Sequence, residues 1–284
     1  MGTNMKFQKN DIVVVEIRDI GHDGEGIGKA EGFTLFVKDA VAGDTVEARI
    51  LKSKKNYAYG RLEKVVVPSP FRVEAKCAYH RQCGGCQLQS LSYEKQLEFK
   101  EKKIRDSLVR IGGFLPEDVD RHMEPIVGME EPFRYRNKAQ YPVGTDKNGN
   151  VVTGFYAGRT HCIIANTDCL LGAAENQEIL HCILDYMRRN RVSTYDETTG
   201  TGLVRHILIR KGFSSGEIMV CLVLNKKMTN MLQKDKDNRS ARTGWLPRQD
   251  QLLCGLVRIK GMTSVSVSIN TEKTNVIMGT EIHT

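Results

Sequence analysis

The first 67 residues constrain the fold most strongly, because they consist of short β-strand patterns separated by turns. Alternating, β-branched stretches recur at residues 11–20, 32–41, 43–54 and 57–67, with glycines between them. No stretch in this region has the apolar repeat of a helix. Four or five short strands within about sixty residues predict a small closed β-barrel of the OB type.

One glycine-rich stretch inside this region, Gly24 to Gly28 (GEGIG), resembles the loops that hold dinucleotides or adenosyl groups. Such a loop follows a strand and opens a helix. Here the next residues, KAEGFTLFV, predict a turn and then a strand. We therefore interpret GEGIG as a turn of the barrel.

Two prolines in Val67–Phe71 (VPSPF) predict a linker, which divides the chain into a first domain at residues 1–70 and a second at 71–284. In the second domain, helices are predicted over residues 92–113, capped by Ser92, and over Ala174–Asn190. Strands are predicted at 133–144, 151–165, 203–210, 217–225 and 256–279, and a polar loop at 226–242. This mixture predicts an α+β fold, with a mixed α/β domain following the barrel.

Charge and apolar patterning limit the environment and the partners. The net charge of +8 favours a polyanionic partner, and the longest apolar run, Ile218–Leu224, is too short to cross a bilayer. The first residues lack the apolar core of a signal peptide. We therefore expect a cytoplasmic protein without membrane contact, in a compartment that disfavours stable disulfides.

Three of the eight cysteines, Cys77, Cys83 and Cys86, lie close together in a C-x5-C-x2-C arrangement. Closely spaced thiolates in a tight loop converge on a soft metal at little entropic cost. Gly84 and Gly85 permit unusual dihedrals there and let backbone amides approach sulfur. The spacing predicts a metal site, and by itself it does not separate zinc from an iron–sulfur cluster.

Both kinds of site need a fourth ligand from elsewhere in the chain. The candidates are His80, Cys162, Cys169, Cys182, Cys221 and Cys254. Cys182 and Cys221 lie in apolar patterns typical of core thiols, and a loop histidine is more often solvated than ligating. Cys169 lies between a predicted strand and a predicted helix, where a loop can deliver it. We favour Cys169, with Cys162 as the second choice.

The segment CGGCQLQSLSYEKQLEFK resembles the iron–sulfur segment of the bacterial 23S ribosomal RNA uracil-5-methyltransferases. GEGIGK and GDTVEARI resemble the RNA-binding TRAM barrel that begins those enzymes. Further blocks are similar in order along nearly the whole chain: FRYRNKAQYPVG, GFYAGRTH, TDCLL, VSTYDETTGTGLVRHILIRKG, GEIMVCLVLN and SINTEKTNVIMG.

The resemblance implies an RNA-binding TRAM barrel and a central domain with a [4Fe–4S] cluster. It implies cluster ligands at Cys77, Cys83, Cys86 and Cys169, in agreement with the choice of Cys169 from the residues. Transfer-RNA members of the wider family typically lack both the barrel and this cysteine set, so the resemblance implies 23S ribosomal RNA as the partner. The sequence leaves the oligomeric state open, with a monomer as the expectation.

In that family the chemistry lies in a Rossmann-like domain that binds S-adenosylmethionine and carries a nucleophilic cysteine. The sequence stops at NVIMGTEIHT, just before the place of that domain, so we expect the catalytic residues beyond Thr284. Cys254 is interpreted as buried and not as the nucleophile. These 284 residues are then expected not to catalyse alone. The alternative is a standalone RNA-binding module with a structural zinc or iron–sulfur site.

Two basic stretches are predicted to contact RNA. In Leu51–Arg61, we expect the cations to neutralise phosphates and the tyrosines to stack on unpaired bases. The residues concerned are Lys52, Lys54, Lys55, Tyr57, Tyr59 and Arg61. The alternative is a hairpin whose tyrosines pack on the barrel. The second stretch places Arg134, Arg136 and Lys138 at alternate positions of one strand face, with Tyr135 and Tyr141 opposite. His161 and His206 are interpreted as structural.

Overall fold

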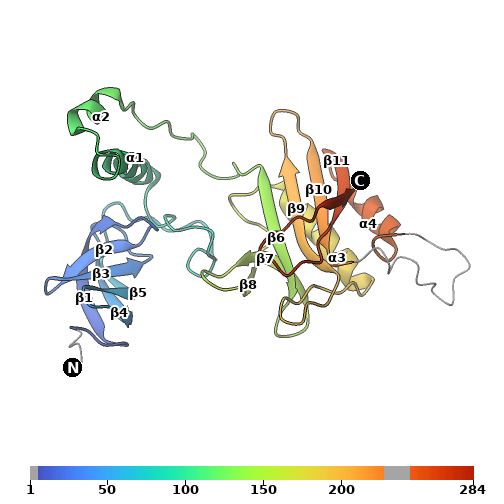
Figure 1. Ribbon diagram of the computed structural model, residues 1–284, viewed down its shortest axis with the longest axis horizontal. Helices are drawn as coiled ribbons and strands as arrows, with labels where there is room; N and C mark the ends of the chain where they lie inside the picture. Colours follow the sequence, from blue (N-terminus) through green and yellow to red (C-terminus); the bar gives the residue numbers. More distant parts are fainter. Residues whose placement is uncertain (1–5, 227–243) are drawn as a thin grey trace, which may run out of the picture. The chain divides into compact units, whose positions relative to one another are not determined.

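The computed structural model describes residues 6–226 and 244–284 and divides into two compact units (Figure 1). The barrel unit comprises the residues up to Arg81 together with Gly85–Glu130, and the sheet unit comprises Gln82–Gly84 and Glu131–Thr284. This division differs from the expected boundary at residue 70, because most of the segment 71–130 groups with the barrel. The predicted polar loop at 226–242 lies, apart from Lys226, outside the described residues.

The barrel unit begins with a closed five-stranded barrel, which confirms the small barrel predicted from the sequence. Its strands are β1 (Ile12–Ile20), β2 (Gly26–Ala30), β3 (Phe33–Lys38), β4 (Thr45–Ser53) and β5 (Tyr57–Val67). They are ordered β1-β2-β3-β5-β4, and β1 pairs with β4 to close the barrel. Alternate residues fill the interior, among them Val15, Ile17, Leu35, Val37, Ile50 and Ala58.

The glycine-rich stretch at 24–28 is only partly a turn, because Gly26 already begins β2. Gly24 has the positive φ of a turn, at +87°. A Cβ on Gly28 would lie 2.3 Å from the backbone oxygen of Glu16 on β1. Glycine therefore allows two strands to approach closely here, and the interpretation of the whole stretch as a turn was wrong.

Two helices follow the barrel in the same unit: α1 (Tyr93–Arg110) and α2 (Pro116–His122). The predicted helix over 92–113 is confirmed as α1, with Ser92 at the N-cap position, although its side chain makes no capping hydrogen bond. None of the residues of α1 is buried. The helix α2 was not predicted.

The described residues of the sheet unit form seven strands and two helices. The strands are β6 (Lys138–Thr145), β7 (Val151–Tyr156), β8 (Ile163–Ala165), β9 (Val204–Lys211), β10 (Ile218–Leu224), β11 (Met262–Ile269) and β12 (Glu281–His283). Their order is β12-β11-β10-β9-β6-β7-β8, and among these described strands only β10 and β11 pair in parallel. The predicted hairpin of β9 and β10 is confirmed. The mixed fold predicted for this region is confirmed as well.

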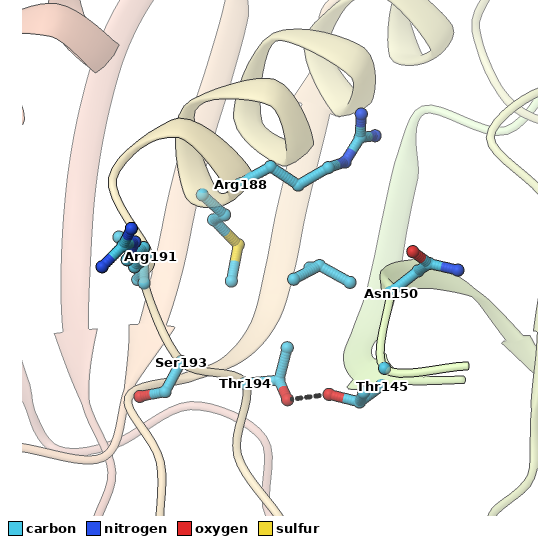
Figure 2. Close-up of a pocket in the computed structure, with 10 residues that line it drawn as sticks. Thr145, Asn150, Arg188, Arg191, Ser193 and Thr194 are labelled. Carbon is cyan, nitrogen blue, oxygen red and sulfur yellow. Dashed lines mark hydrogen bonds between the residues drawn. The ribbon is translucent and has the colours of Figure 1, made fainter. Parts of the chain in front are cut away.

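Helices α3 (Glu175–Arg189) and α4 (Gln249–Leu256) share one hydrophobic core with the sheet. The predicted apolar face of α3 is confirmed as buried, through Ile179, Leu180, Ile183, Leu184 and Met187. Burying each such side chain stabilises the fold by about 1.5–3 kcal/mol. Beyond the end of α3, the hydroxyls of Thr194 and Thr145 form a 2.7 Å hydrogen bond that joins the following loop to the end of β6 (Figure 2).

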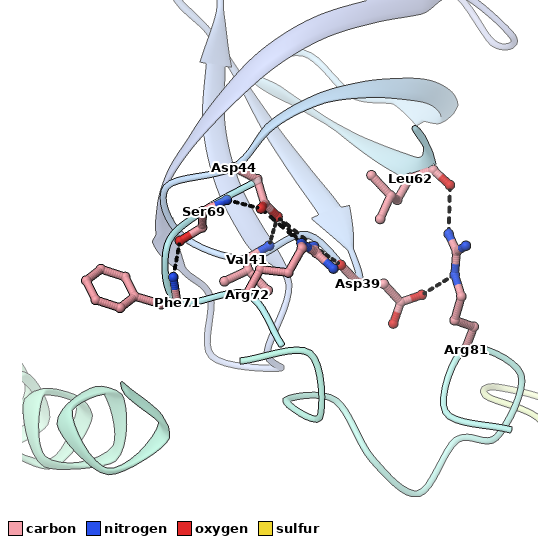
Figure 3. A network of polar contacts seen from close by, with 8 residues as sticks. All are labelled: Asp39, Val41, Asp44, Leu62, Ser69, Phe71, Arg72 and Arg81. Atoms are coloured by element: carbon pink, nitrogen blue, oxygen red, sulfur yellow. Dashed lines mark hydrogen bonds and ion pairs between the residues drawn. The ribbon is translucent and has the colours of Figure 1, made fainter. Parts of the chain in front are cut away.

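One buried ion pair fastens the barrel to the segment that leaves it (Figure 3). Asp44 is fully buried, and Arg72 donates to its carboxylate from Nη2 at 2.6 Å and from Nε at 3.0 Å. The backbone amides of Ser69 and Val41 donate to the same carboxylate. Burial acts to raise the pKa of Asp44, but the hydrogen bonds from Arg72, Ser69 and Val41 outweigh it and hold that pKa below its usual value.

Candidate functional site

Three aromatic side chains form a cluster on the outer face of the barrel. Phe36 lies on β3, and Tyr57 and Tyr59 lie on β5. Each pair of rings has its centroids 5.6 or 5.7 Å apart. All three side chains are partly exposed, whereas Ala58 between the tyrosines is fully buried. We call this cluster the aromatic face; it offers flat apolar surface of the kind on which unpaired bases stack.

Phe36 was not among the predicted RNA contacts. The signal for it was present in the alternation of β3, where Leu35 and Val37 point into the barrel and Phe36 must therefore point out. The parallel pairing of β3 with β5 then places Phe36 beside Tyr59. That pairing joins residues far apart in the sequence, and local patterns do not reveal it.

The predicted lysines surround the aromatic face. Lys52 pairs with Tyr59 across the β4–β5 ladder, so both side chains lie on the same face of the barrel. Lys54 and Lys55 are exposed in the hairpin that connects the two strands. Ammonium groups beside exposed rings provide the two contacts that single-stranded RNA needs, phosphate neutralisation and stacking.

Arg61 differs from the lysines because a carboxylate already holds it. Its Nη2 lies 2.7 Å from Oε1 of Glu63, and the Nε of Arg49 lies 2.8 Å from the same oxygen. These two donors, Arg61 first, lower the pKa of Glu63. Arg61 is thus part of an exposed charge cluster, in which the carboxylate competes with phosphate for its guanidinium.

The predicted face of alternating cations at 134–138 was wrong. Strand β6 begins only at Lys138, and Arg134 has a φ of +56°, which breaks the alternation. Tyr141 is fully buried, and its hydroxyl accepts a hydrogen bond from Asn176. Lys138 and Tyr135 remain exposed. This segment does not form the regular basic strand face that the sequence predicted.

Arg134 instead braces the loop that carries Cys169. Its guanidinium lies 2.7 Å from a carboxylate oxygen of Asp168 and donates to the backbone oxygen of Cys169 at 3.2 Å. The backbone amides of Arg134 and Arg136 donate to Leu170 and Leu171. Together they hold the side chain and the amide of Arg134, whose φ is positive, on the same loop.

The predicted cluster ligands are all partly buried, and they are divided between the two units. Cys77 and Cys86 belong to the barrel unit, and Cys83 and Cys169 belong to the sheet unit. The backbone oxygen of Cys77 accepts hydrogen bonds from the backbone amide and Nδ1 of His80. His80 is therefore engaged in holding the turn after Cys77.

Within the sheet unit, Cys83 forms an isolated antiparallel bridge with Ala157, and the Gly84 amide donates to the Tyr156 oxygen. A Cβ on Gly84 would lie 3.0 Å from the Cα of Gly158. Gly84 is thus needed for the close approach of two backbones. Neither Gly84 nor Gly85 has a positive φ, so the left-handed conformation that glycine permits is not used here.

The donor set of four thiols suits an iron–sulfur cluster or zinc by its chemistry. In residues 6–226 and 244–284, however, no three His, Cys, Asp or Glu side chains gather closely enough to hold a metal ion. The structure therefore does not show an assembled metal site.

Two other cysteines behave differently from each other. Cys221 is fully buried, as expected, and burial raises the pKa of its thiol. Cys254, which was predicted to be buried, is exposed on α4. The apolar pattern around it places Leu252 and Leu256 in the core, and the helix turns the cysteine between them outward.

The two singled-out histidines occupy contrasting environments. His161 is exposed; its Nδ1 contacts a carboxylate oxygen of Glu197, and its ring stacks on Tyr156. His206 is buried in β9, and burial, with the neighbouring charge of Arg205, lowers its pKa to about 4. A buried histidine that stays neutral at neutral pH is suited to a structural role.

Among the helices in the described part of the chain, none combines the length and the apolarity needed to cross a membrane.

Comparison with known proteins places these features in context. Residues 6–62, which contain most of the barrel, match the TRAM domain family. The chain is 39% identical over 282 residues to an uncharacterized RNA methyltransferase of Clostridium tetani, covering 99% of this chain and 56% of that protein. It is 38% identical over 282 residues to another of Bacillus cereus, covering 98% of this chain and 57% of that protein.

One solved structure covers most of the chain: the tRNA (uracil-54, C5)-methyltransferase of Pyrococcus abyssi, in complex with S-adenosyl-L-homocysteine. The TM-score is 0.60 at 24% identity, with 95% of this chain and 55% of that chain covered. This likeness concerns the fold. The chain spans about half the length of the curated relatives it matches. Over nearly its full length it is thus similar to RNA methyltransferases, and its barrel matches the TRAM domain.

Proposed function

We propose that this chain supplies the RNA-binding portion of an S-adenosylmethionine-dependent enzyme that methylates C5 of uridine in RNA. The observation that carries the proposal is the 39% identity to an RNA methyltransferase over 282 residues. The aromatic face supports it, because partly exposed rings flanked by Lys52, Lys54 and Lys55 offer both stacking and phosphate contacts. The net charge of +8 favours the same partner.

We further propose that residues 1–70 act as the RNA-binding barrel domain and that residues 71–284 form a central domain in the cytoplasmic, monomeric protein. Methyl transfer is assigned to neither part. A Rossmann-type cofactor site lies at the carboxyl ends of parallel strands, beside a glycine loop. Among the described strands of the sheet unit, β10 and β11 are the one neighbouring pair with parallel pairing.

Ribosomal RNA of the 23S type is the proposed substrate, on the strength of the cysteine-rich segment. The presence of the barrel does not favour ribosomal RNA over transfer RNA as the substrate. The structural match with the transfer-RNA enzyme of Pyrococcus abyssi extends over 95% of this chain. The discriminating feature is therefore the set Cys77, Cys83, Cys86 and Cys169, which we propose as ligands of a [4Fe–4S] cluster. Thiolate ligands in a loop rich in backbone amides favour such a cluster.

The cluster proposal is tested by anaerobic purification followed by iron, sulfide and zinc analysis. The expected result is a brown protein with about four irons and four sulfides per chain. Replacing Cys169 by serine should lower the iron content, whereas the matched change Cys254→Ser, at an exposed cysteine, should leave it unchanged. A colourless protein with one zinc would refute the cluster and leave RNA binding untouched.

RNA binding is tested by titrating the purified chain with 23S ribosomal RNA fragments, transfer RNA and duplex DNA at several salt concentrations. We expect the tightest binding to ribosomal RNA, weakening as salt rises. Equal affinity for duplex DNA would contradict the proposal. With labelled S-adenosylmethionine and 23S ribosomal RNA, the chain alone is expected to transfer no methyl group, and incorporation of label would overturn the assignment of these residues to binding only.

A further inference from the structure

Two stacked rings lie at the end of β7, apart from the aromatic face and from the proposed cluster ligands. The ring of His161 stacks on the ring of Tyr156, with centroids 5.1 Å apart and planes 29° apart. Both residues belong to the sheet unit. Tyr156 is the last residue of β7, and His161 lies in the loop between β7 and β8. We call these two side chains the ring pair.

One carboxylate fixes the orientation of both rings. The Tyr156 hydroxyl donates to Oε1 of Glu197 at 3.3 Å, and Nδ1 of His161 lies 2.5 Å from Oε2 of the same residue. Burial, followed by the charge of Glu197, raises the pKa of Tyr156 to about 12, so its hydroxyl keeps the proton at neutral pH. An ionised carboxylate only accepts hydrogen bonds, so Nδ1 carries the proton of the His161 ring. The imidazole is therefore held at one edge and on one face.

The backbone around the ring pair is fixed as well. The backbone amide of Ala157 donates to the carbonyl oxygen of Cys162 at 2.8 Å and closes the loop that carries His161. The amide of Gly84 donates to the carbonyl oxygen of Tyr156 at 3.0 Å. These contacts restrict the loop before any ligand arrives, so less conformational entropy is lost when one binds.

The outer face of the His161 ring is open to solvent. The side chain is 65% exposed, although one face rests on Tyr156 and Nδ1 faces Glu197. The exposed surface is therefore the opposite face of the ring, together with the edge that carries Nε2. A flat ring that is supported from behind is a surface on which an unpaired base stacks, and histidine serves proteins in this way alongside the larger aromatic residues.

The charge at the ring pair favours a base over a phosphate group. While the imidazole is neutral, the carboxylate of Glu197 gives the two groups a net negative charge, and when the imidazole is protonated the two charges cancel. Neither state offers a phosphate group a net positive charge. Arg205, whose charge acts on Tyr156, is only 5% exposed and donates to two backbone oxygens. An uncharged base can stack in both states of the imidazole.

We infer that the ring pair is a stacking site for one unpaired nucleobase of RNA, which packs on the outer face of His161. Tyr156 and Glu197 are positioning residues, because they act on the base through the imidazole. The inference rests on the proposed RNA binding and adds a contact on the sheet unit to those on the barrel. It gives His161 a role beyond the structural one that the sequence indicated.

The first test measures binding of a labelled single-stranded RNA by fluorescence anisotropy. His161→Ala should weaken binding about tenfold, as expected for the loss of one stacked base. His161→Phe keeps a ring and should restore most of the affinity, although it loses the contact with Glu197. Equal losses in these two variants would overturn the stacking site.

The matched control is His181→Ala. His181 is an exposed histidine of the same unit, and its Nε2 forms a 3.0 Å hydrogen bond with the hydroxyl of Thr167. The substitution should leave the affinity for RNA unchanged. A loss equal to that of His161→Ala would show that the effect is not specific to the ring pair and would overturn the inference.

The salt dependence of binding separates stacking from phosphate contact. Removal of a cation that neutralises a phosphate lowers the slope of log affinity against log salt by about one. Because a stacked base releases no counterion, His161→Ala should leave this slope unchanged. A slope lowered by about one would overturn the assignment to a base in favour of a phosphate contact.

A fluorescent base reports the stacking directly. A set of RNAs carries 2-aminopurine, whose emission falls when it stacks, at successive positions. At one position the emission should fall on binding to the unmodified chain but not on binding to saturating His161→Ala. Equal emission with both proteins at every position would overturn the inference.

Thermal unfolding is measured for every variant, and His161→Phe keeps the test decisive if His161→Ala does not fold. RNA binding that is unaffected by His161→Ala overturns the inference and leaves the proposed function standing. Absence of RNA binding by the unmodified chain refutes both.

Discussion

Helices α1 and α3 both carry an apolar face, which is the stronger one on α3, and their environments are opposite. Seven residues of α3 are buried against the sheet, whereas no residue of α1 is buried. Ile104 on α1 is 57% exposed, and Ile111 just after it is 85% exposed. An apolar repeat therefore predicts a helix and which of its faces is apolar. It does not predict whether another part of the described structure covers that face.

The largest expected effect comes from a buried charge compared with an exposed one. Asp44→Asn leaves the partly buried guanidinium of Arg72 without its carboxylate and should lower the free energy of unfolding by about 3–5 kcal/mol. Asp120→Asn removes the exposed partner of Arg105 in the α1–α2 pair, at 2.6 Å, and should have no measurable effect. Urea unfolding measures both. Equal losses of unfolding free energy in the two variants would contradict the view that burial, and not distance, determines how strongly the Asp44–Arg72 pair stabilises the fold.

The next effect compares the helices directly. Leu180→Ala on α3 removes a fully buried side chain and should lower the free energy of unfolding by about 2–5 kcal/mol. Ile104→Ala on α1 should change it by less than about 0.5 kcal/mol. The two substitutions are compared in the same denaturant series. A large loss at Ile104 would mean that the apolar face of α1 is covered in solution.

Acid should destabilise the fold through the buried histidine, His206, and not through the exposed one, His161. The pKa of His206 falls from its usual 6.5 to about 4 on folding, because burial disfavours the charged ring. The unfolded chain then binds more protons between these values, so stability falls as the pH drops from about 6.5 to 4, by up to about 3 kcal/mol. His206→Gln should flatten this dependence, and His161→Gln should preserve it. Thermal unfolding across that pH range distinguishes the two.

The smallest expected effect concerns RNA and compares the partly exposed Tyr57 with the exposed Tyr135. Tyr57→Ala on the aromatic face should weaken binding of single-stranded RNA by about 1–3 kcal/mol, the contribution of one stacked base. Tyr135 is exposed at 44%, but it lies in a segment that forms no regular face. Tyr135→Ala should leave the affinity unchanged. A loss confined to Tyr135 would move the interface away from the barrel.

Local patterns sufficed for much of the fold. The strands of the barrel, the helices α1 and α3 and the β9–β10 hairpin follow from alternation and from the helical repeat. Strand β2 was not predicted, because its glycines resemble those of a turn. At Gly28 the glycine instead allows the close approach of β1. The sequence also does not reveal that β3 and β5 pair, which is what brings Phe36 to Tyr59.

Prediction of the site failed where distant segments decide a side chain's partners. Arg134 lies in a strand-like pattern, but the loop at 168–172, about 35 residues away, draws its amide and guanidinium into a different conformation. The stack of His161 on Tyr156 depends likewise on Glu197, which lies 36 residues further along the chain than His161. Such contacts depend on tertiary packing, and residue type or spacing does not encode them locally.

The uncovered apolar face of α1 also affects the colloidal behaviour of this polypeptide. At low ionic strength, mutual repulsion between molecules of charge +8 keeps such surfaces apart. Raising the salt concentration screens this repulsion but does not weaken attraction between the exposed side chains of Ile104, Ile111 and Phe114. Under the proposed function, the salt concentration that releases RNA is therefore also a condition that favours self-association.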